Sequence, residues 1–454
     1  MRHKLFSLYC KILAVFSRRY LKKCKPYIIW INWSVWKTSC RMIVYQTLCK
    51  FINNKKIYTS NKNFNWELGL SLSIFKIEEF SPTPWCVIKT FFYVMWTALF
   101  GEKLYDIIVL EYGIDRPMEM EFLLQIAKPN IWIFTAIDSV HSMQFGNPAN
   151  IAKEEKKMVQ NTLDFAFLNA DDQDAMSLIS GLEIDYLTYQ TQWYDAENVD
   201  ISFDNETFKY ENDNLCVSFD LSVRQKNLNV TTNIIWKANY GYIWVALAIA
   251  DIVNYKDGKW SILDSFDDLY LEYKLQWWRL SVFDWLYDSL IFDSTYNASP
   301  LSVEKILNTV HNVKRDLFPE SEIWLMLGDM RELWDLTEKD HRKIAPYVHS
   351  VADRVFLVWE NMRKFLKDEL WKVWYDMSKV EEFSDSVTLW DRVKDELKKT
   401  DSKILIIWKG SQNTIFLEEA VKLLLADDED SKNLVRQSEW WQKKKKKFFD
   451  SVEK

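Results

Sequence analysis

The segment KPYIIWINWSVWKTSCRMIVYQTL, which begins at Lys25, constrains the fold most strongly. Apolar residues from Tyr27 to Ile29 predict a buried strand, and the apolar periodicity after Lys37 predicts a helix. A short turn joins the two and ends in a Lys-Thr-Ser run at 37–39. Strand, loop and helix in this order are typical of a phosphate-binding loop, in which backbone N–H groups and a helix N-terminus face phosphate oxygens. The lysine would neutralise phosphate charge, and a hydroxyl would hold magnesium.

Bulky side chains stand where such a loop needs glycine. The 454 residues include only 9 Gly but 23 Trp. Glycine is about 2% of the chain against a usual ~7%, and the two residue types together reach about 7%. Because Trp30, Trp33 and Trp36 precede the Lys-Thr-Ser run, we expect many tryptophans to stand for glycine through a recoded UGA codon. The alternative is a genuinely Trp-rich protein with indoles in its core or binding surfaces.

With glycine at these three positions the segment reads GINGSVGKTS, which resembles the GxxGxxGKT[ST] loop of the Mur ligase family. The resemblance implies that the ATP-binding residues of the loop are Trp33, Ser34, Val35, Trp36, Lys37, Thr38 and Ser39. It further implies that Lys37 is catalytic and that Thr38 is a magnesium ligand. From the residues alone, the alternative is a buried Trp-rich strand and turn with an accidental Lys-Thr pair.

Two further predicted strands lead to candidate metal ligands. Residues Ile107 to Leu110 predict a buried strand that ends in Glu111, at the edge where open α/β sheets bind ligands. The V-L-E-x-G context resembles that of the family's magnesium-binding glutamate and implies that Glu111 is catalytic. In IWIFTAIDSVH the resemblance implies that His141 is catalytic and binds a second magnesium. Without it, Glu111 would be a solvated loop residue and His141 an ordinary histidine.

The chain departs from the family pattern in the helix that follows. Many members have A-K-x-K there, with the second lysine carbamylated, whereas this chain reads AKEEK from Ala152. The comparison places Glu155 at the metal-binding lysine, and its carboxylate could replace the carbamate. A one-residue shift to Lys156 remains open.

The segment LQWWRLSVFDWLYDSLIFDSTYNASP, with Gly in place of Trp, resembles the family's G-R-x-x-x-x-x-G, strand, D-x-Y-N-A-x-P segment. This implies a catalytic, phosphate-contacting Arg279, since a guanidinium can stabilise charge on transferring phosphoryl oxygens. It also implies ATP contacts for Asp293 at the ribose or nearby and for Tyr296 and Asn297 at the adenine. The residues alone predict a strand-to-helix turn with Ser299 as N-cap.

The last third alternates apolar strands, at EIWLMLGDM, RVFLVW and KILIIWKGS, with amphipathic helices. This alternation predicts a doubly wound parallel sheet. The segments LGDMRELW and WKGS resemble those of the family branch that adds D-alanyl-D-alanine. They imply that Asp329, Lys409 and Ser411 bind the incoming dipeptide or close the site, although turn chemistry alone could account for them.

We therefore predict an α/β protein with a central P-loop ATPase domain at 26–292, built on a mostly parallel sheet, and a Rossmann-like C-terminal domain at 293–440. Residues 1–25 predict a basic amphipathic helix that could either rest weakly on anionic lipid or pack on the next domain. We predict a basic tail at residues 441–454, as either a solvated helix end or a disordered basic patch. We expect the helix to replace the family's N-terminal UDP-binding domain.

The resemblance implies an ATP- and Mg²⁺-dependent ligase that adds D-alanyl-D-alanine to a muramoyl-tripeptide through an acyl phosphate. A folylpolyglutamate- or cyanophycin-type amide ligase is the alternative enzyme. A non-catalytic nucleotide-binding scaffold is the third reading, because literal tryptophans would block the loop. The net charge of -7 gives no reason to expect nucleic acid, and six cysteines without a CxxC pair fit a reducing compartment. We expect a cytoplasmic monomer.

Overall fold

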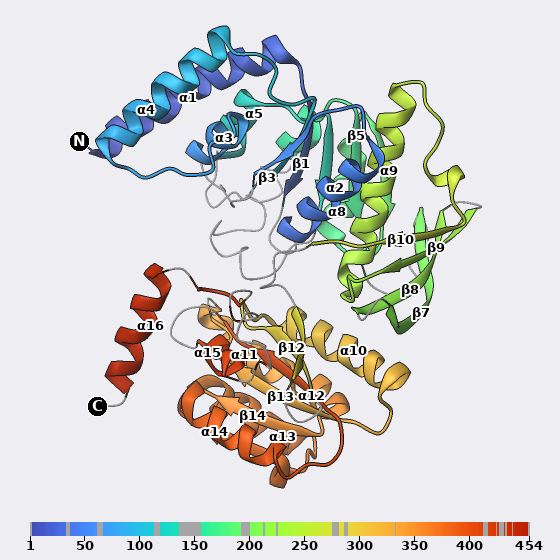
Figure 1. The fold of residues 1–454 in the computed structure, drawn as a ribbon, viewed down its shortest axis with the longest axis vertical. Helices are drawn as coiled ribbons and strands as arrows, with labels where there is room; N and C mark the ends of the chain where they lie inside the picture. Colours follow the sequence, from blue (N-terminus) through green and yellow to red (C-terminus); the bar gives the residue numbers. More distant parts are fainter. Residues whose placement is uncertain are drawn as a thin grey trace. The chain divides into compact units, whose positions relative to one another are not determined.

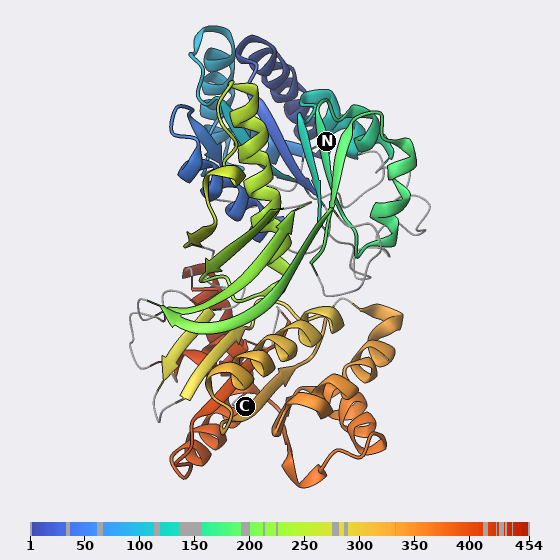
Figure 2. The same cartoon turned by 90° about the vertical axis from the view of Figure 1, so that its right-hand side faces the viewer.

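The structure is a computed structural model. It describes the whole chain except residues 1, 33–36, 61–66, 113–118, 136–155, 192–199, 212–213, 224–225, 275–280, 286–288, 332, 412–415, 424, 426–430, 432–433, 438 and 453–454. The chain divides into two compact units, and the first comprises 1–205, 219–231 and 238–274. The second comprises 206–218, 232–237 and 275–454. Figure 1 and Figure 2 show the elements of each unit.

The first unit is built on a six-stranded parallel sheet with the order β2-β3-β1-β4-β5-β6. Its strands are β1 (Tyr27–Asn32), β2 (Ile57–Thr59), β3 (Ile107–Tyr112), β4 (Ile131–Phe134), β5 (Phe165–Asn169) and β6 (Asp185–Tyr189). Its principal helices are α1 (Arg2–Cys24), α2 (Lys37–Phe51), α3 (Glu67–Ile74), α4 (Pro84–Phe100), α5 (Glu119–Ile126), α8 (Gln173–Ser177) and α9 (Tyr240–Lys256). The expected parallel α/β architecture is confirmed here.

Successive side chains of β1 point to opposite faces of the sheet, so its apolar residues pack against two different layers of helices. Ile28 and Trp30 belong to a core shared with α1, α3, α4 and α5. Helices α2 and α9 cover the opposite face, where the ring of Phe167 from β5 meets Trp244 of α9. The sheet is therefore buried on both faces, which explains why its strands are almost continuously apolar.

A second sheet has four strands in the order β10-β9-β8-β7. These are β7 (Ile201–Glu211), β8 (Asn214–Val223), β9 (Lys226–Thr232) and β10 (Asp268–Leu271). Buried Ile201 and Phe203 alternate with exposed Ser202 and Asp204, which indicates that one face of β7 is solvated at its start.

The second unit contains a six-stranded sheet with the order β11-β12-β16-β13-β14-β15, in which only the β11–β12 pair is antiparallel. Its strands are β11 (Ser281–Trp285), β12 (Ser289–Ser294), β13 (Glu322–Gly328), β14 (Arg354–Val358), β15 (Val380–Phe383) and β16 (Ile404–Lys409). The principal helices are α10 (Pro300–Leu317), α11 (Thr337–Lys343), α12 (Ala345–Val351), α13 (Lys367–Lys372), α14 (Ser386–Leu397), α15 (Leu417–Lys422) and α16 (Glu439–Val452). The three strands predicted in the last third are thus confirmed as β13, β14 and β16.

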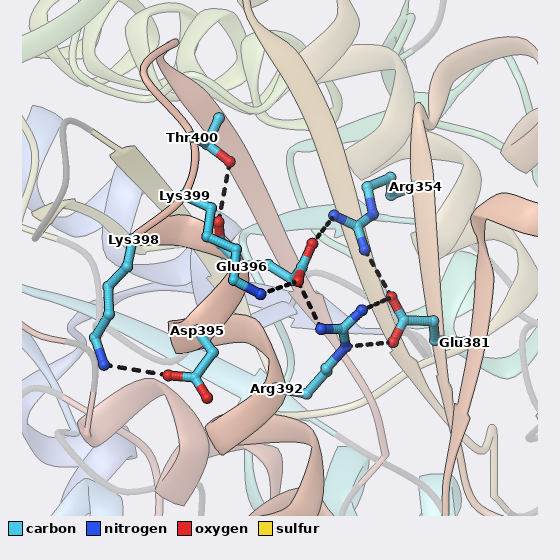
Figure 3. Close-up of polar contacts among 8 residues, drawn as sticks. All are labelled: Arg354, Glu381, Arg392, Asp395, Glu396, Lys398, Lys399 and Thr400. Atoms are coloured by element: carbon cyan, nitrogen blue, oxygen red, sulfur yellow. Dashed lines mark hydrogen bonds and ion pairs between the residues drawn. The ribbon is translucent and has the colours of Figure 1, made fainter.

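Ser299 caps α10 as its sequence predicts, with its hydroxyl oxygen accepting the N–H of Ser302 at 3.4 Å. At the far edge of the same sheet, two arginines and two glutamates form a network of ion pairs (Figure 3). Arg354 of β14 contacts Glu381 at 2.6 Å and Glu396 at 3.0 Å, and Arg392 of α14 contacts the same two carboxylates. The network ties the edge strand β15 to α14.

Several details differ from the sequence predictions. Strand β1 continues to Asn32, so Trp30 lies inside the strand, fully buried, and not in the loop. Glu111 likewise lies within β3, where it is paired with Ile31 of β1, because parallel pairing continues beyond the apolar run. The basic tail belongs to the helix α16, as one of its two predicted alternatives has it, but Lys445 is not solvated: it is buried in contact with Glu418 at 3.1 Å.

Helix α1 packs on the first unit through buried Cys10, Leu13 and Ala14, as one of the two interpretations of the N-terminal segment predicts. In the described part of the chain, no helix has both the length and the apolar character needed to span a bilayer.

Candidate functional site

The carboxyl edge of the first parallel sheet collects the residues expected to handle phosphate and metal. Asn32 ends β1, and Lys37 begins α2 directly after the loop 33–36. Glu111 lies on the neighbouring β3, one position before that strand ends. In parallel α/β sheets this edge is where ligands bind, and the N-terminus of a helix such as α2 favours an anion.

Thr38 and Glu111 are held against each other at this edge. The Thr38 hydroxyl lies 3.0 Å from Oε1 and 2.9 Å from Oε2 of Glu111. Both side chains are nearly inaccessible, with exposed fractions of 1% for Thr38 and 5% for Glu111. A hydroxyl and a carboxylate are the hard oxygen donors that Mg²⁺ prefers. The pair therefore fits the role of magnesium ligands that the sequence assigns to both residues.

Arg41, which the sequence analysis did not single out, holds Glu111 from the next turn of α2. Its Nε lies 3.2 Å from Oε2 of Glu111, and its Nη1 donates to the Thr59 hydroxyl at 3.1 Å. Thr59 in turn donates to the carbonyl of Val109 at 2.8 Å. The position of Arg41 in the sequence could have indicated this contact. Arg41 follows Thr38 by three residues, and residues three apart on a helix lie on the same face.

Polar contacts also fix the neighbouring strand ends at this edge. Trp132 of β4 donates its indole N–H to Oδ1 of Asn32 at 2.6 Å, and the Thr135 hydroxyl donates to the carbonyl of Asn32 at 3.0 Å. Asn169, which ends β5, donates to the carbonyl of Thr135 at 2.7 Å. Three neighbouring strand ends are thereby joined at the point where the loop leaves the sheet.

Of the other residues assigned to this edge, Lys37 is half-buried and Ser39 is buried in the first turn of α2. The remaining assigned residues lie outside the described residues: Trp33, Ser34, Val35, Trp36, His141, Glu155 and Arg279. Lys156, the alternative to Glu155, is exposed at the start of the helical segment 156–161. Within the described ranges, no cluster of three or more His, Cys, Asp or Glu side chains forms a metal site.

The second unit gathers its candidate residues at the carboxyl edge of its own sheet. Asp293 and Ser294 end β12 in register with Trp408 and Lys409 at the end of β16. Asp329 follows β13, the other neighbour of β16. Parallel pairing thus brings together the side chains that three distant sequence motifs predicted.

Lys409 is buried among uncharged acceptors. Its ammonium group donates to the Ser294 hydroxyl at 3.1 Å, to the Ser294 carbonyl at 3.4 Å and to the carbonyl of Asn297. Burial lowers the pKa of Lys409 to about 7, against the opposing effect of the Asp293 charge. Burial raises the pKa of Asp293 to about 6, although its carboxylate accepts the N–H of Thr295 at 3.0 Å.

Asp329 and Ser411 form hydrogen bonds that hold neighbouring loops together. The Asp329 carboxylate accepts the N–H of Met362 at 2.9 Å and both the N–H and the side-chain amide of Asn361. The Ser411 hydroxyl accepts the N–H of Arg331 at 2.9 Å and donates to the carbonyl of Ala298 at 3.2 Å. Both residues therefore position the loops of this edge.

The two residues assigned to the adenine differ in exposure, since Tyr296 is half-buried and Asn297 is exposed. Asn297 also accepts the N–H of Ala298 through its own Oδ1 at 2.9 Å. Neither side chain is enclosed by the second unit, so both remain accessible to a ligand at the start of α10.

Comparison with known families agrees with this arrangement. The Mur ligase middle domain matches residues 34–250, and the Mur ligase glutamate ligase domain matches residues 279–412. Together these matches take in most of the chain, including Thr38, Glu111, Asp293 and Lys409. The chain belongs to the Mur ligase family, whose members are ATP-dependent acid–amino-acid ligases.

Individual relatives are distant but extend over most of the chain. A UDP-N-acetylmuramoyl-tripeptide–D-alanyl-D-alanine ligase of Borreliella burgdorferi is 24% identical over 88% of this chain and 75% of its own. The enzyme with the same name from Bacillus subtilis is 22% identical over 91% of this chain and 79% of its own. Among solved structures, MurF from Acinetobacter baumannii shares the fold with a TM-score of 0.68 at 16% identity, covering 90% of this chain and 79% of that one.

Proposed function

We propose that this chain joins D-alanyl-D-alanine to a muramoyl-tripeptide cell-wall precursor at the expense of ATP. The observation that supports the ATP-dependent half is the contact between Thr38 and Glu111 at the start of α2, where a hydroxyl and a carboxylate converge beside a helix N-terminus. The choice of substrates is supported by the names of the two curated relatives and by the GDMREL and KGS segments.

In the proposed reaction the terminal phosphoryl group of ATP moves to the precursor's peptide carboxylate. The amine of the dipeptide then attacks the acyl phosphate, the new amide forms, and phosphate leaves. Such chemistry depends on positioning and charge neutralisation more than on a strong protein nucleophile. A bound Mg²⁺ ion would supply charge neutralisation at the phosphoryl oxygens.

The chain's own residues divide the remaining work. Lys37 and Arg279 neutralise phosphate charge in this proposal, and Thr38 and Glu111 hold the metal. Arg41 fixes the Glu111 carboxylate through their 3.2 Å contact, so that its oxygens stay aligned with the Thr38 hydroxyl. His141 and Glu155 are proposed as ligands of a second Mg²⁺.

In the second unit, Asp293, Tyr296 and Asn297 are proposed to contact the nucleoside of ATP. Lys409, Ser411 and Asp329 are proposed to form the binding site for the dipeptide. For Asp329 and Ser411 this role is indirect, because their polar atoms already hold neighbouring backbone. Lys409 acts through its charge, which its burial makes sensitive to pH.

The deciding experiment measures phosphate release by a protein with Gly at positions 30, 33 and 36. D-alanyl-D-alanine, L-lysine and L-glutamate are compared as amines, each with a UDP-linked and a UDP-free muramoyl-tripeptide. We expect release only with the acceptor and D-alanyl-D-alanine together, with the amine as the stricter requirement.

Preference for L-glutamate would replace the proposal with a folylpolyglutamate-like activity. Nucleotide binding without release under any combination would favour a scaffold. A strict requirement for UDP would show that part of this chain recognises the UDP end of the precursor.

A further inference from the structure

The side of α4 that faces solvent is apolar. Its exposed large side chains are Trp85, Ile88, Phe92, Tyr93, Trp96 and Phe100, with exposed fractions between 45% and 76%. Their spacing of three and four residues places them along one stripe of the helix. Val94 and Ala98 on the other side are fully buried in the core of the first unit. Helix α4 is therefore apolar on both sides, although only one side is covered.

Helix α1 lies beside α4 and extends this surface (Figure 1, Figure 2). The Tyr9 hydroxyl donates to the carbonyl of Val87 at 3.1 Å, and the Phe16 and Phe91 rings meet edge to face with centroids 6.0 Å apart. The apolar residues that α1 adds are Leu8, Ile12 and Val15. We call these three side chains and the six of α4 the α1–α4 face. Exposed apolar surfaces of this kind commonly mark interaction sites.

All charged side chains of α1 and α4 themselves are positive. Neither α1 nor α4 contains a carboxylate, and the exposed cations of the two helices are Lys11, Arg19, Lys22, Lys23 and Lys89. The chain as a whole has a net charge of -7, so this region is opposite in sign to the rest of the protein. Two copies meeting through this face would bring like charges together, which opposes self-association.

We propose that the α1–α4 face docks the protein on an anionic lipid surface. Phe92, Tyr93 and Phe100 enter the boundary between headgroups and acyl chains, and the lysines extend toward lipid phosphates. Because no described helix is suited to cross the bilayer, both helices lie in the plane of the surface. The surface does not depend on tryptophan, since Gly at 85 and 96 would still leave Ile88 and three aromatic rings exposed.

The test is co-sedimentation of the full chain with vesicles of phosphatidylglycerol and phosphatidylcholine, compared with phosphatidylcholine alone. We expect binding to the anionic vesicles that weakens as salt is raised, because attraction between lysines and anionic lipid is screened. The double variant Phe92→Gln/Phe100→Gln should lower the partition coefficient roughly tenfold or more. The variant Lys11→Gln/Lys89→Gln should lower it on anionic vesicles only.

A matched control is Leu163→Gln/Tyr255→Gln, which alters two exposed apolar residues outside the face, at 54% and 83%. This control should bind vesicles as the unmodified protein does. Unchanged circular dichroism of every variant would exclude misfolding as the cause of lost binding. Equal binding by the Phe92→Gln/Phe100→Gln variant, or absence of binding by the unmodified protein, would overturn the proposal. A dimer in lipid-free solution that these substitutions dissociate would identify a second copy as the occupant instead.

Discussion

The carboxyl edges of the two six-stranded sheets hold acidic and basic side chains in different ways. At the first edge Glu111 is in direct contact with Arg41 and with the Thr38 hydroxyl. At the second edge Asp293 and Lys409 end neighbouring strands, but the Lys409 ammonium donates to uncharged oxygens. Burial consequently raises the pKa of Asp293 to about 6 and lowers that of Lys409 to about 7.

The two edges therefore surround their buried charged groups in different ways. The first edge orients a carboxylate by placing a cation and a hydroxyl against it, as a metal ligand requires. The second edge leaves an acid and a base without a direct ion pair between them, so the ionisation of each costs desolvation energy. We therefore expect the first edge to respond to mutation of a partner and the second to respond to pH.

The largest expected effect is the loss of turnover on substitution of the first-edge carboxylate. Glu111→Gln removes the charge while keeping the shape of the side chain. Because a metal ion contributes several kcal/mol to stabilising a phosphoryl-transfer transition state, ATP turnover should fall by about a thousandfold or more. Phosphate release at saturating Mg²⁺ measures this fall.

Glu396→Gln is the matched control, since Glu396 is also paired with arginine but belongs to the network of Figure 3. It should leave turnover within about twofold of the unmodified protein, because surface pairs contribute little. Near-normal turnover of Glu111→Gln would show that Glu111 is not part of the site. The contrast between the two edges would then have no functional meaning.

A buried ion pair should also cost far more to disrupt than an exposed one. Arg41→Met leaves Glu111 as an uncompensated buried charge, which should lower the free energy of unfolding by about 3–5 kcal/mol. Arg392→Met, in the half-exposed network, should lower it by about 1 kcal/mol or less. Urea unfolding of the two variants compares them directly. Equal losses of unfolding free energy in the two variants would show that the buried pair contributes no more to stability than the half-exposed network.

The pH dependence of the second edge has a predicted sign. The folded chain releases the Lys409 proton above about pH 7, whereas the unfolded chain holds it to the ordinary value of 10.5. The contribution of Lys409 to the free energy of unfolding should therefore increase as the pH rises above 7, and it should be lost as the pH falls through 7. Between pH 7 and 8.5 the unfolding free energy of the unmodified protein should increase by about 2 kcal/mol more than that of the Lys409→Met variant.

Asp293→Asn tests the opposite sign at lower pH. The pKa of Asp293 is raised, so its contribution is present below the ordinary value of 3.8 and is lost as pH rises through about 6. Urea midpoints measured from pH 4 to 8.5 separate the two windows. Identical pH profiles for the unmodified protein and Lys409→Met would contradict the assignment of the second edge.

The sequence predicted the sheets better than it predicted their edges. Apolar runs define β3, β13 and β16, because burial on both faces leaves a continuous signal. The contact of Glu111 with Arg41 was missed, since an arginine in a helix resembles any solvated residue until the strand beside it is known. Parallel pairing also places Asp293 and Lys409 at the ends of neighbouring strands, and their separation in sequence conceals this.

The buried role of Lys445 was missed for a related reason. A run of lysines predicts a solvated tail, yet the α16 helix turns one of them toward Glu418 and Glu419. Only the three-dimensional path of the chain identifies which lysine of the run is buried. Local charge patterns therefore predict helix formation more reliably than they predict the partners of each side chain.

The smallest expected effect concerns the tryptophans that we interpret as glycines. In the second unit, Trp359 directly follows β14 with φ of 77°, and Trp374 follows α13 with φ of 65°. The left-handed region is unfavourable for any side chain, and a residue just beyond a helix end in this conformation is most often glycine. Trp374 is also 90% exposed, so its indole contributes little packing. Trp374→Gly should therefore raise the unfolding free energy by about 0.5–1 kcal/mol.

Trp371→Gly provides the control, because Trp371 is also exposed but lies inside α13. There glycine should lower the unfolding free energy by roughly 0.5 kcal/mol or more, since it has the weaker helix propensity. Opposite signs for substitutions three residues apart would show that backbone conformation, and not loss of an indole, decides the effect. Peptide masses of the natural protein across positions 33, 36 and 374 provide the independent measurement. Tryptophan at all three positions would refute recoding, and the phosphate loop of the first edge would then have to bind its ligand with two indoles in place.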